Sequence, residues 1–507
     1  MPLWLAIVLP ALPLQLAARA LEADAPLVIV EGPAQRLQVA FCNDAARLAG
    51  VAAGQKLAAA QALAASLIAV ERKPERERDA LLELAGWAYQ FSAAVSVRDD
   101  GLLVETGGSE RLFGGRARLN RDLAAQLAGL GYRGAFGEAA TPQAAWWLAQ
   151  ASARGLTVAS PVTPEQLPAA LAPLPLAVPG WPADTVDTLH ALGLRTLHDL
   201  LRLPRDGVNR RFGSHLLADV DRALGRLPDP QPAFEPPQRF FAVIELPADV
   251  VDTAQLMFPA QRLLRSLEGF LRGRGAGATE LRFAARHSPR RTVARPPTAI
   301  ELALAAPERD ASRLAQLLGE RLDRVRLPEP AVALSLAVER LLPFAAASAS
   351  FLPPAPDAQA GLDWLKLAET LHARLGSARV FQLQAVDDHR PERAWRAVPI
   401  AVDAAERIAP AHATGERPLL IVPQPLPLPG REQAADEPPR YGGALWLVAG
   451  PERIEAGWWD LASPAFGQPR GVVARDYFVA RNPHGQTLWI YRDLAEPRGW
   501  FLHGFFA

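Results

Sequence analysis

The sequence predicts an α+β protein that is built from several domains. Its 507 residues exceed what one hydrophobic core organises, and domains of roughly 100–200 residues imply about three or four of them. Up to residue 160, short apolar runs typical of strands are mixed with helical segments in an irregular order, which favours α+β over a strictly alternating architecture. Proline-rich stretches at 161–182 and 228–237 then divide the chain.

The composition is that of a globular protein, with 50% hydrophobic and 21% charged residues. Lys+Arg and Asp+Glu balance at 54 each, so any contact with nucleic acid must depend on local clusters of charge. The single cysteine, Cys42, excludes an intramolecular disulfide and a cysteine-built zinc site, which fits the cytoplasm. We expect no metal and no cofactor.

The apolar N-terminus has two interpretations. Residues 3–16 imitate a secretory signal, but no Lys or Arg precedes them, and Pro10 and Pro13 interrupt the run. We therefore expect a buried first strand at 3–9, and sequencing of the mature chain would test the secreted alternative. No later run reaches the ~18 apolar residues of a membrane helix, so no membrane association is expected.

The first domain is expected to mix short strands and helices. Strands are predicted at 3–9, 26–30, 38–42, around Val95 and at 102–105, and helices at 12–21, 43–49, up to Gln90 and at 119–130. Arg98-Asp-Asp-Gly101 is a plausible hairpin turn between two of these strands.

Beyond the first proline-rich stretch, two short helices are predicted around Gly193, closed by Pro204. After the second stretch, the order strand, helix, strand, strand, helix, strand indicates a compact βαββαβ unit. The elements that we locate in this unit are strands at 240–246, 279–285 and 331–340 and helices at 254–271 and 309–325. A linker rich in Ala, Ser and Pro follows, and then a tryptophan-rich remainder.

Several of these parts resemble the Y-family DNA polymerases. Asn43 to Val51, followed by Gly54, is similar to a fingers signature in which an arginine helix precedes a Gly-Val-x-x-Gly turn. The strand at 96–105 occupies the place of the palm strand that carries catalytic acids. Pro179-Gly180 with Leu192 to Leu197 resembles the helix–hairpin–helix of a thumb, and the βαββαβ unit fits a little finger.

Strings near the C-terminus are similar to the ImuB branch of that family, within the UmuC/DinB-like superfamily. They are Asp388-His-Arg-Pro-Glu-Arg-Ala-Trp395, Arg475-Asp-Tyr-Phe478, Leu488-Trp-Ile-Tyr-Arg-Asp493 and Trp500-Phe-Leu-His-Gly-Phe-Phe506. The resemblance implies a right-hand fold of palm, fingers and thumb, a little finger and a C-terminal extension. The expected domains are palm and fingers at 1–165 (fingers about 12–72), thumb at 166–230, DNA-binding little finger at 236–344, linker at 345–360 and partner-binding domain at 361–507.

The residues that the resemblance aligns with a polymerase site are degraded. Nucleotidyl transfer uses two metal ions held by carboxylates, and active relatives carry one Asp at the end of the first strand and an Asp-Glu pair in the palm hairpin. Here no acid lies between Met1 and Leu21, and the pair appears as Asp100-Gly101. The degenerate site is expected near Val8, Asp99, Asp100 and Glu105.

A relic of nucleotide binding is expected at Arg47. The place of a tyrosine beside it is taken by Asp44, whose charge would repel a nucleotide, and the place of a palm lysine falls near Ala140 to Pro142. Asp99 and Asp100 beside a glycine equally suit a turn without any metal. Arg47 equally suits a solvated or salt-bridged helix position.

The retained activity that we expect is binding of DNA through an arginine cluster. The stretch 261–295 holds nine arginines against two acids, a balance that favours salt-sensitive phosphate contacts, although arginines also solvate helices. The predicted DNA-binding residues are Arg262, Arg265, Arg272, Arg274, Arg282, Arg286, Arg290 and Arg291.

The resemblance also implies partner proteins. A short peptide after the little finger is expected to bind the β sliding clamp, with Phe351 and Leu352 as the candidate; Gln382 to Val386 is an alternative that we expect inside a strand. A RecA-like accessory protein of the ImuA type and an error-prone C-family polymerase are the other expected partners. Tryptophans 446, 458, 459, 489 and 500 are expected to lie mostly in a core, with some at a partner surface.

Two functions from different classes follow. The first is a non-catalytic, DNA-binding adaptor, a pseudoenzyme in the SOS mutagenesis and translesion synthesis complex that links the clamp, the accessory protein and the error-prone polymerase. The second is an active Y-family translesion polymerase with a rearranged metal site, which would need Asp99 or Asp100 together with Glu105.

Overall fold

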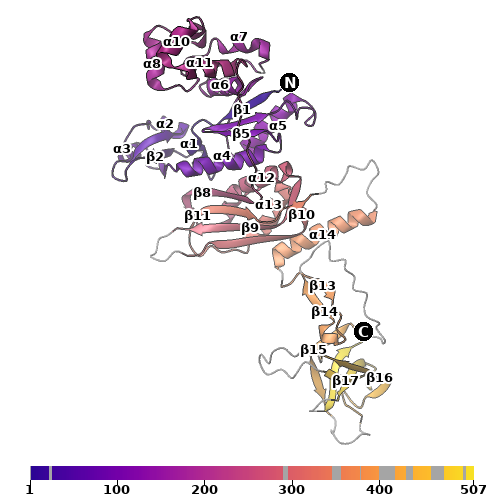
Figure 1. The fold of residues 1–507 in the computed structure, drawn as a ribbon. Helices are drawn as coiled ribbons and strands as arrows, with labels where there is room; N and C mark the ends of the chain where they lie inside the picture. Colours follow the sequence, from indigo (N-terminus) through magenta and orange to yellow (C-terminus); the bar gives the residue numbers. More distant parts are fainter. Residues whose placement is uncertain are drawn as a thin grey trace. The chain divides into compact units, whose positions relative to one another are not determined.

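The computed structural model describes residues 2–21, 25–160, 162–288, 295–344, 356–376, 378–398, 417–429, 438–457, 473–494 and 498–506, with the side chains of 356–363 left aside. The chain divides into two compact units, Met1–Arg374 and Leu375–Ala507 (Figure 1). Within the described residues, no helix is both long enough and apolar enough to cross a bilayer.

A four-stranded antiparallel sheet organises the N-terminal part of the first unit. Its strands, in spatial order, are β5 (Val95–Arg98), β6 (Gly101–Glu105), β1 (Trp4–Val8) and β7 (Ala135–Ala139). β1 is central, and Leu5 and Ile7 pack against one side chain cluster while Ala6 and Val8 pack against another. The run of apolar residues at the N-terminus thus reflects a strand that is buried on both faces, as predicted.

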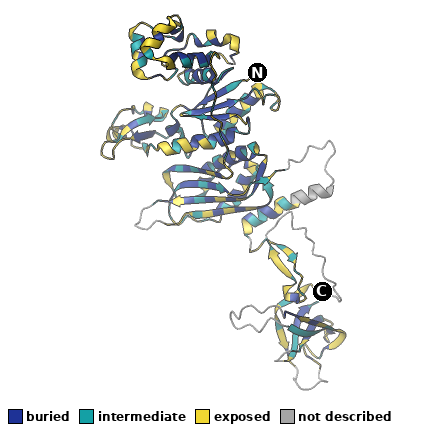
Figure 2. Ribbon diagram, in the orientation of Figure 1, coloured by how far each residue is buried: buried dark blue, intermediate teal, exposed yellow. Residues whose placement is uncertain are grey.

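Helices cover both faces of this sheet, as the buried interior in Figure 2 shows. α4 (Pro74–Ala88) and α5 (Arg116–Gly129) share one core with it, and α6 (Pro142–Ala153) shares the other. α6 begins at Pro142 because Thr141 accepts a hydrogen bond from the Ala144 amide and caps the helix.

The segment that we expected to form the fingers contains a smaller sheet. Its strands, in order, are β3 (Gln38–Cys42), β2 (Leu27–Glu31) and β4 (Ile68–Glu71), and its helices are α1 (Leu12–Ala18), α2 (Asp44–Leu48) and α3 (Leu57–Leu63). Asn43 caps α2 through the Ala46 amide, which explains why the helix starts where the sequence pattern placed it.

Short helices follow α6 and share its core. They are a 3₁₀ turn (Pro164–Gln166), α7 (Leu167–Leu171), α8 (Ala183–Ala191), α9 (Leu197–Leu201), α10 (Arg205–Phe212) and α11 (Ser214–Ala223). Gly193, with a positive φ of 82°, turns the chain between α8 and α9. Trp181 is buried and donates a hydrogen bond to Asp219 at 3.2 Å, so it serves the core of this helical region.

The βαββαβ prediction corresponds to an antiparallel sheet with two helices on one face. Its strands, in order, are β10 (Thr298–Glu308), β9 (Ala276–His287), β11 (Ala331–Val338) and β8 (Phe240–Val250), with β12 (Leu342–Pro343) pairing β9, and its helices are α12 (Met257–Gly273) and α13 (Ala311–Leu322). A 3₁₀ turn (Thr253–Leu256) precedes α12. The sequence pattern required four strands but located three; β10 is the strand that was not placed.

The expected end of the linker needs correction. We expected a linker to residue 360 and a separate domain from 361, but α14 (Pro356–Leu375) already begins inside that linker. Its buried Glu369 accepts a hydrogen bond from the Ala305 amide at 2.9 Å and pairs with Arg313, which anchors α14 to β10 and α13. The division between the compact units therefore falls after Arg374.

The second unit is built from strands. A hairpin joins β13 (Gln382–Ala385) and β14 (Trp395–Val398), with a 3₁₀ turn (Pro391–Arg393) between them. The main sheet is antiparallel, in the order β15 (Leu420–Leu428), β19 (Gly499–Phe505), β18 (Thr487–Asp493), β17 (Val473–Arg481) and β16 (Trp446–Ala456).

Candidate functional site

The end of β1 lies against the turn between β5 and β6. The pairing of Val8 with Gly101 brings the Leu9 amide within 2.8 Å of the Asp100 carbonyl oxygen. Asp99 and Asp100 form the two-residue turn itself, and Gln150 of α6 donates a hydrogen bond to the Asp100 carboxylate at 2.9 Å. The structure therefore brings Val8, Asp99 and Asp100 together, as the sequence indicated.

Glu105 does not join this group. It is paired with Trp4 at the far end of the same two strands, four residues along from Gly101, or about 13 Å at the usual rise of a strand. There its carboxylate accepts hydrogen bonds from the Leu3 amide at 3.1 Å and the Gly107 amide at 3.0 Å. The strand predicted at 102–105 already implied this distance, although the expected site included Glu105.

The residues at the turn do not fit a two-metal centre. Such a centre needs several carboxylates converging on two cations about 3.5–4 Å apart. Beside Asp99 and Asp100, the end of the first strand would have to supply the third carboxylate. The residues there are Leu9, which is buried, and Pro10. Throughout the described ranges, no three His, Cys, Asp or Glu side chains gather in a way that would hold a metal ion.

The fingers-like arginine is paired inside its own helix. Arg47 lies 3.3 Å from the Asp44 carboxylate and donates a hydrogen bond to the Cys42 carbonyl at 3.1 Å. Both charged side chains are well exposed. The acidic residue that replaces a tyrosine thus partly neutralises the arginine that we expected as a phosphate relic.

Two of the predicted DNA-binding arginines project from the open face of the βαββαβ sheet. Arg282 and Arg286 alternate along β9 with buried Leu281, Phe283 and Ala285, so they point away from the helices. Their side chains are 64% and 55% exposed. Each has a carboxylate partner on the same face: Glu301 lies 3.2 Å from Arg282, and Glu245 lies 2.9 Å from Arg286.

Other predicted arginines tie the sheet domain to the rest of the first unit. Arg262 donates to the carbonyl oxygens of Ala18 and Arg19 at the end of α1, and burial lowers its pKa to about 10. Arg265 donates to the Gly129 carbonyl at 2.8 Å. Because backbone oxygens occupy these donors, Arg262 and Arg265 hold α12 in place and are less accessible to phosphate than Arg282 and Arg286.

The remaining predicted arginines are distributed in three ways. Arg272 pairs with Glu268 one turn back on α12, and Arg274 donates to the carbonyls of Pro236 and Pro237. Arg290, Arg291 and the clamp candidates Phe351 and Leu352 lie outside the described residues. The alternative clamp peptide, which we expected inside a strand, does lie in β13.

Sequence reasoning missed two cations that approach the same face. Lys73 and Arg76, at the start of α4, lie 3.8 Å and 3.0 Å from the Glu245 carboxylate of β8. About 170 positions of chain separate these partners, so no local pattern could have connected them. The charged stretch 71–79 was the available signal, but by itself it indicated only a charged helix start.

Comparison with known proteins identifies the family of the chain. Residues 13–150 match the impB/mucB/samB family. Protein ImuB of Caulobacter vibrioides, in strain NA1000 / CB15N and equally in strain ATCC 19089 / CIP 103742 / CB 15, is 31% identical over 486 residues, which cover 90% of this chain and 100% of that protein. The chain belongs to the ImuB family.

Similar solved structures are Y-family polymerases. The chimera Dbh-Dpo4(243-245)-Dbh matches with a TM-score of 0.38 at 16% identity, covering 67% of this chain and 99% of its own. DinB from Sulfolobus solfataricus matches with a TM-score of 0.35 at 14% identity, covering 68% of this chain and 100% of its own. The predicted membership of the ImuB branch and the α+β architecture with a C-terminal extension are confirmed.

The C-terminal strings that resembled ImuB proteins meet in one buried group. Arg475 donates to Glu392 at 2.9 Å and to the Tyr477 hydroxyl oxygen at 3.2 Å, and the Tyr477 hydroxyl lies 2.8 Å from His503 Nδ1. Burial raises the pKa of Tyr491, which packs beside Tyr477, to about 12. Residues far apart in the chain thus form a single polar centre within this sheet.

Asp388 caps a turn in one of these strings. Its carboxylate accepts hydrogen bonds from the Arg390 amide and guanidinium at 2.9 Å, and the guanidinium lowers the pKa of Asp388. Of the tryptophans singled out from the sequence, Trp489 is buried, Trp500 is half-buried and Trp446 is exposed. Trp458 and Trp459 lie outside the described residues.

The buried imidazole predicts that the C-terminal unit loses stability in mild acid. Burial lowers the pKa of His503 from 6.5 to about 4, so between these values the unfolded chain binds a proton that the folded unit does not. Stability should therefore fall by about 2–3 kcal/mol as pH drops from 6.5 to 4 and then level off. Hydrogen exchange of the β17 and β19 peptides across this pH range measures the effect.

His503→Gln provides the control for that prediction. The variant is less stable than the wild-type protein at every pH because it loses the Tyr477 contact. Between pH 6.5 and 4, however, its stability should fall much less than that of the wild-type protein, because glutamine does not titrate. Equal pH dependence in both proteins would contradict the assignment to His503.

Proposed function

We propose that this protein is a non-catalytic, DNA-binding adaptor in a DNA-damage mutagenesis complex that carries out translesion synthesis. One observation carries the non-catalytic part: apolar Leu9 and Pro10 stand beside the Asp99-Asp100 turn, where a two-metal site would need a further carboxylate. A single missing ligand is enough to disable two-metal phosphoryl transfer. Membership of the ImuB family supports the mutagenesis role.

The proposed contact with DNA is the open face of the βαββαβ sheet, centred on Arg282 and Arg286. Exposed guanidinium groups bind phosphates without regard to sequence, as an adaptor on damaged DNA requires. Arg272, Arg274, Arg290 and Arg291 extend the proposal along the same segment, and Arg262 and Arg265 contribute mainly by fixing α12. We place this activity in the cytoplasm.

The proposed partners follow from the family resemblance. Phe351 and Leu352 are the proposed clamp-binding residues, and the C-terminal unit is the proposed platform for a RecA-like accessory protein and an error-prone C-family polymerase. The exposed Trp446 at the start of β16 suits such a platform, because tryptophan is enriched where proteins bind one another.

An active polymerase is the second candidate function. Asp99 and Asp100 remain side by side at the palm-like turn, and this observation favours residual metal binding. Glu105 cannot complete the site from the far end of β6, which makes this candidate weaker than the adaptor.

Primer extension and DNA binding by the purified full chain separate the two functions. With Mg²⁺ or Mn²⁺ we expect no primer extension. We also expect DNA binding, with a binding constant whose logarithm falls linearly as the logarithm of the salt concentration rises. In Arg282→Gln/Arg286→Gln that slope should become shallower by about 2, because each phosphate contact contributes about 0.9.

Each outcome of this experiment is informative. Extension that disappears in Asp100→Ala would establish an active polymerase and overturn the adaptor. Absence of both extension and binding would reject DNA as the ligand. An unchanged salt slope in the double variant would move the DNA contact away from the open face.

A further inference from the structure

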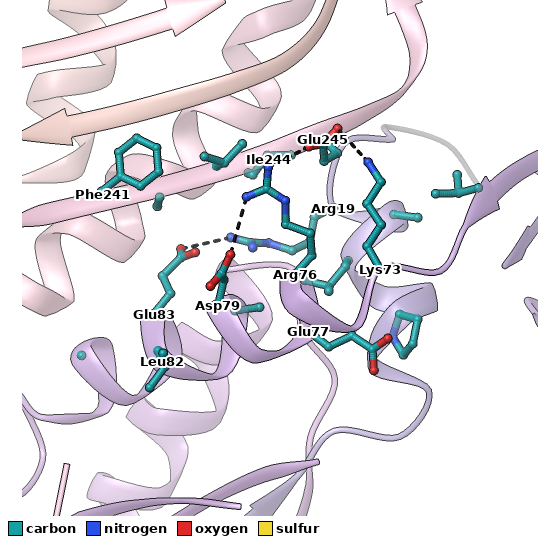
Figure 3. Close-up of a pocket in the computed structure, with 18 of the residues that line it drawn as sticks. Arg19, Lys73, Arg76, Glu77, Asp79, Leu82, Glu83, Phe241, Ile244 and Glu245 are labelled. Atoms are coloured by element: carbon teal, nitrogen blue, oxygen red, sulfur yellow. Dashed lines mark hydrogen bonds and ion pairs between the residues drawn. The ribbon is translucent and has the colours of Figure 1, made fainter. Parts of the chain in front are cut away.

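Three cations converge on one carboxylate at the edge of the βαββαβ sheet. Glu245 of β8 lies 3.0 Å from Arg76 and 3.8 Å from Lys73, both at the start of α4 (Figure 3). Arg286 of β9 donates to both Glu245 oxygens at 2.9 Å.

The geometry explains why these side chains meet. Ala333 of β11 is in register with both Glu245 and Arg286, so Arg286 reaches across one small residue on the open face. β8 is an edge strand, and Lys73 and Arg76 approach it from α4 beside a cleft of about 900 Å³ that β8, α4 and α1 line. Glu245 therefore connects the open sheet face to the palm-like helix.

The arrangement has the chemistry of an occupied phosphate site. A carboxylate and a phosphodiester each present two oxygens sharing one negative charge, and Arg and Lys bind both. The four side chains are between 31% and 55% exposed, so water screens these ion pairs and another anion can compete for the cations. Asp79, 3.7 Å from Arg76, is the other acid close to the group, while Glu31 and Glu77 are paired with Arg72.

We propose that Lys73, Arg76 and Arg286 form a binding site for a DNA backbone phosphate, which Glu245 occupies in the DNA-free protein. This inference rests on the proposed DNA binding and extends it from the sheet face onto α4. DNA displaces Glu245, and the phosphate then bridges α4 and β9 in its place. Glu245 thus weakens the binding of DNA by competing for the same cations.

Neutralising Glu245 while keeping its shape tests the site. Glu245→Gln should bind a short DNA duplex about tenfold more tightly at low salt, with a salt slope within about 1 of the wild-type value, because DNA contacts the same phosphate site in both proteins but no longer has to displace Glu245. Glu301→Gln is the matched control: it frees only Arg282 on the same face, so its gain should stay below about threefold. In Arg76→Gln/Glu245→Gln most of the tenfold gain should disappear.

Hydrogen exchange adds a readout of the contact itself. Peptides covering 73–79 and 240–247 should exchange faster in Glu245→Gln without DNA. When DNA is added to the wild-type protein, the peptide covering 240–247 should exchange faster, because Glu245 is displaced, while the peptide covering 73–79 stays protected by the phosphate. If Glu245→Gln fails to fold, Arg76→Gln alone decides, because losing a phosphate contact should reduce the wild-type salt slope by about 1.

The outcomes separate this inference from the proposed function. Wild-type binding with equal gains in Glu245→Gln and Glu301→Gln would overturn the phosphate site while the adaptor proposal stands. A gain in Glu245→Gln that survives removal of Arg76 would also overturn it. No DNA binding by any of these proteins would reject the proposed function and this inference together.

Discussion

Replacing Trp489 with alanine is expected to destabilise the C-terminal sheet by about 3–5 kcal/mol, the usual cost of removing a large buried aromatic side chain. Trp489 is 2% exposed at the centre of β18. Its ring stacks on Tyr477 at 4.2 Å and lies nearly parallel to His503 at 5.6 Å, and Arg417 lies over it at 5.0 Å. An alanine would leave a cavity beside the polar centre of Arg475, Tyr477 and His503.

Trp446→Ala is the matched control for this prediction. Trp446 lies in the same sheet but is 59% exposed on edge strand β16, so its loss should change stability by less than about 0.5 kcal/mol. Denaturant titration of the full chain measures the stability of both variants. Hydrogen exchange of peptides within 473–494 then assigns the change to the C-terminal unit. Equal losses in the two variants would contradict the burial of Trp489.

This pair also shows how far composition predicts a core. The abundance of tryptophan near the C-terminus correctly indicated a mixture of buried and exposed rings. It could not say which ring is buried, because β18 carries side chains in a core on each face and shows no alternation of apolar and polar residues. Strand order decides the matter, with β18 central and β16 at the edge.

The fold of the first unit was more accessible to sequence reasoning. Strands with strong local signals, such as β1 and β3, and the amphipathic helices α12 and α13 lie where the patterns placed them. β10 was missed although Thr298 to Ala303 alternates, because Pro296-Pro297 directly before it read as a break. The position of α14 depends on a tertiary contact through Glu369, which no local pattern contains.

The candidate site was predictable where it is local in the chain. The turn at Asp99-Asp100 and the absence of an acid in the first strand are visible in the sequence and lie together in the structure. The separation of Glu105 follows from the length of the strand after the turn, whereas the meeting of Glu245 with α4 depends on tertiary packing. Arginines also cannot be sorted by sequence into those that bind backbone carbonyls and those that project into solvent, such as Arg262 and Arg282.

The register that sets Asp99 and Asp100 beside Leu9 leads to the second large prediction. Gly101→Ala should destabilise the first unit by about 1–3 kcal/mol, because overpacking against backbone cannot be relieved by a side chain rotation. A methyl group at Gly101 would overlap the Ile7 carbonyl oxygen and stand 3.0 Å from the Val8 Cα atom. β6 can approach β1 this closely only with glycine at that position.

Gly207→Ala is the control, since it adds the same methyl group to α10 with no atom within 4 Å. Alanine is the better helix former, so this variant should gain about 0.5–1 kcal/mol. Chemical denaturation gives the difference between the two variants, and hydrogen exchange of peptides within 2–9 and 95–105 localises it. If Gly101→Ala were as stable as Gly207→Ala, the hairpin could not lie against β1 as described. A carboxylate from elsewhere could then reach Asp99 and Asp100, and the physical basis for a non-catalytic protein would be lost.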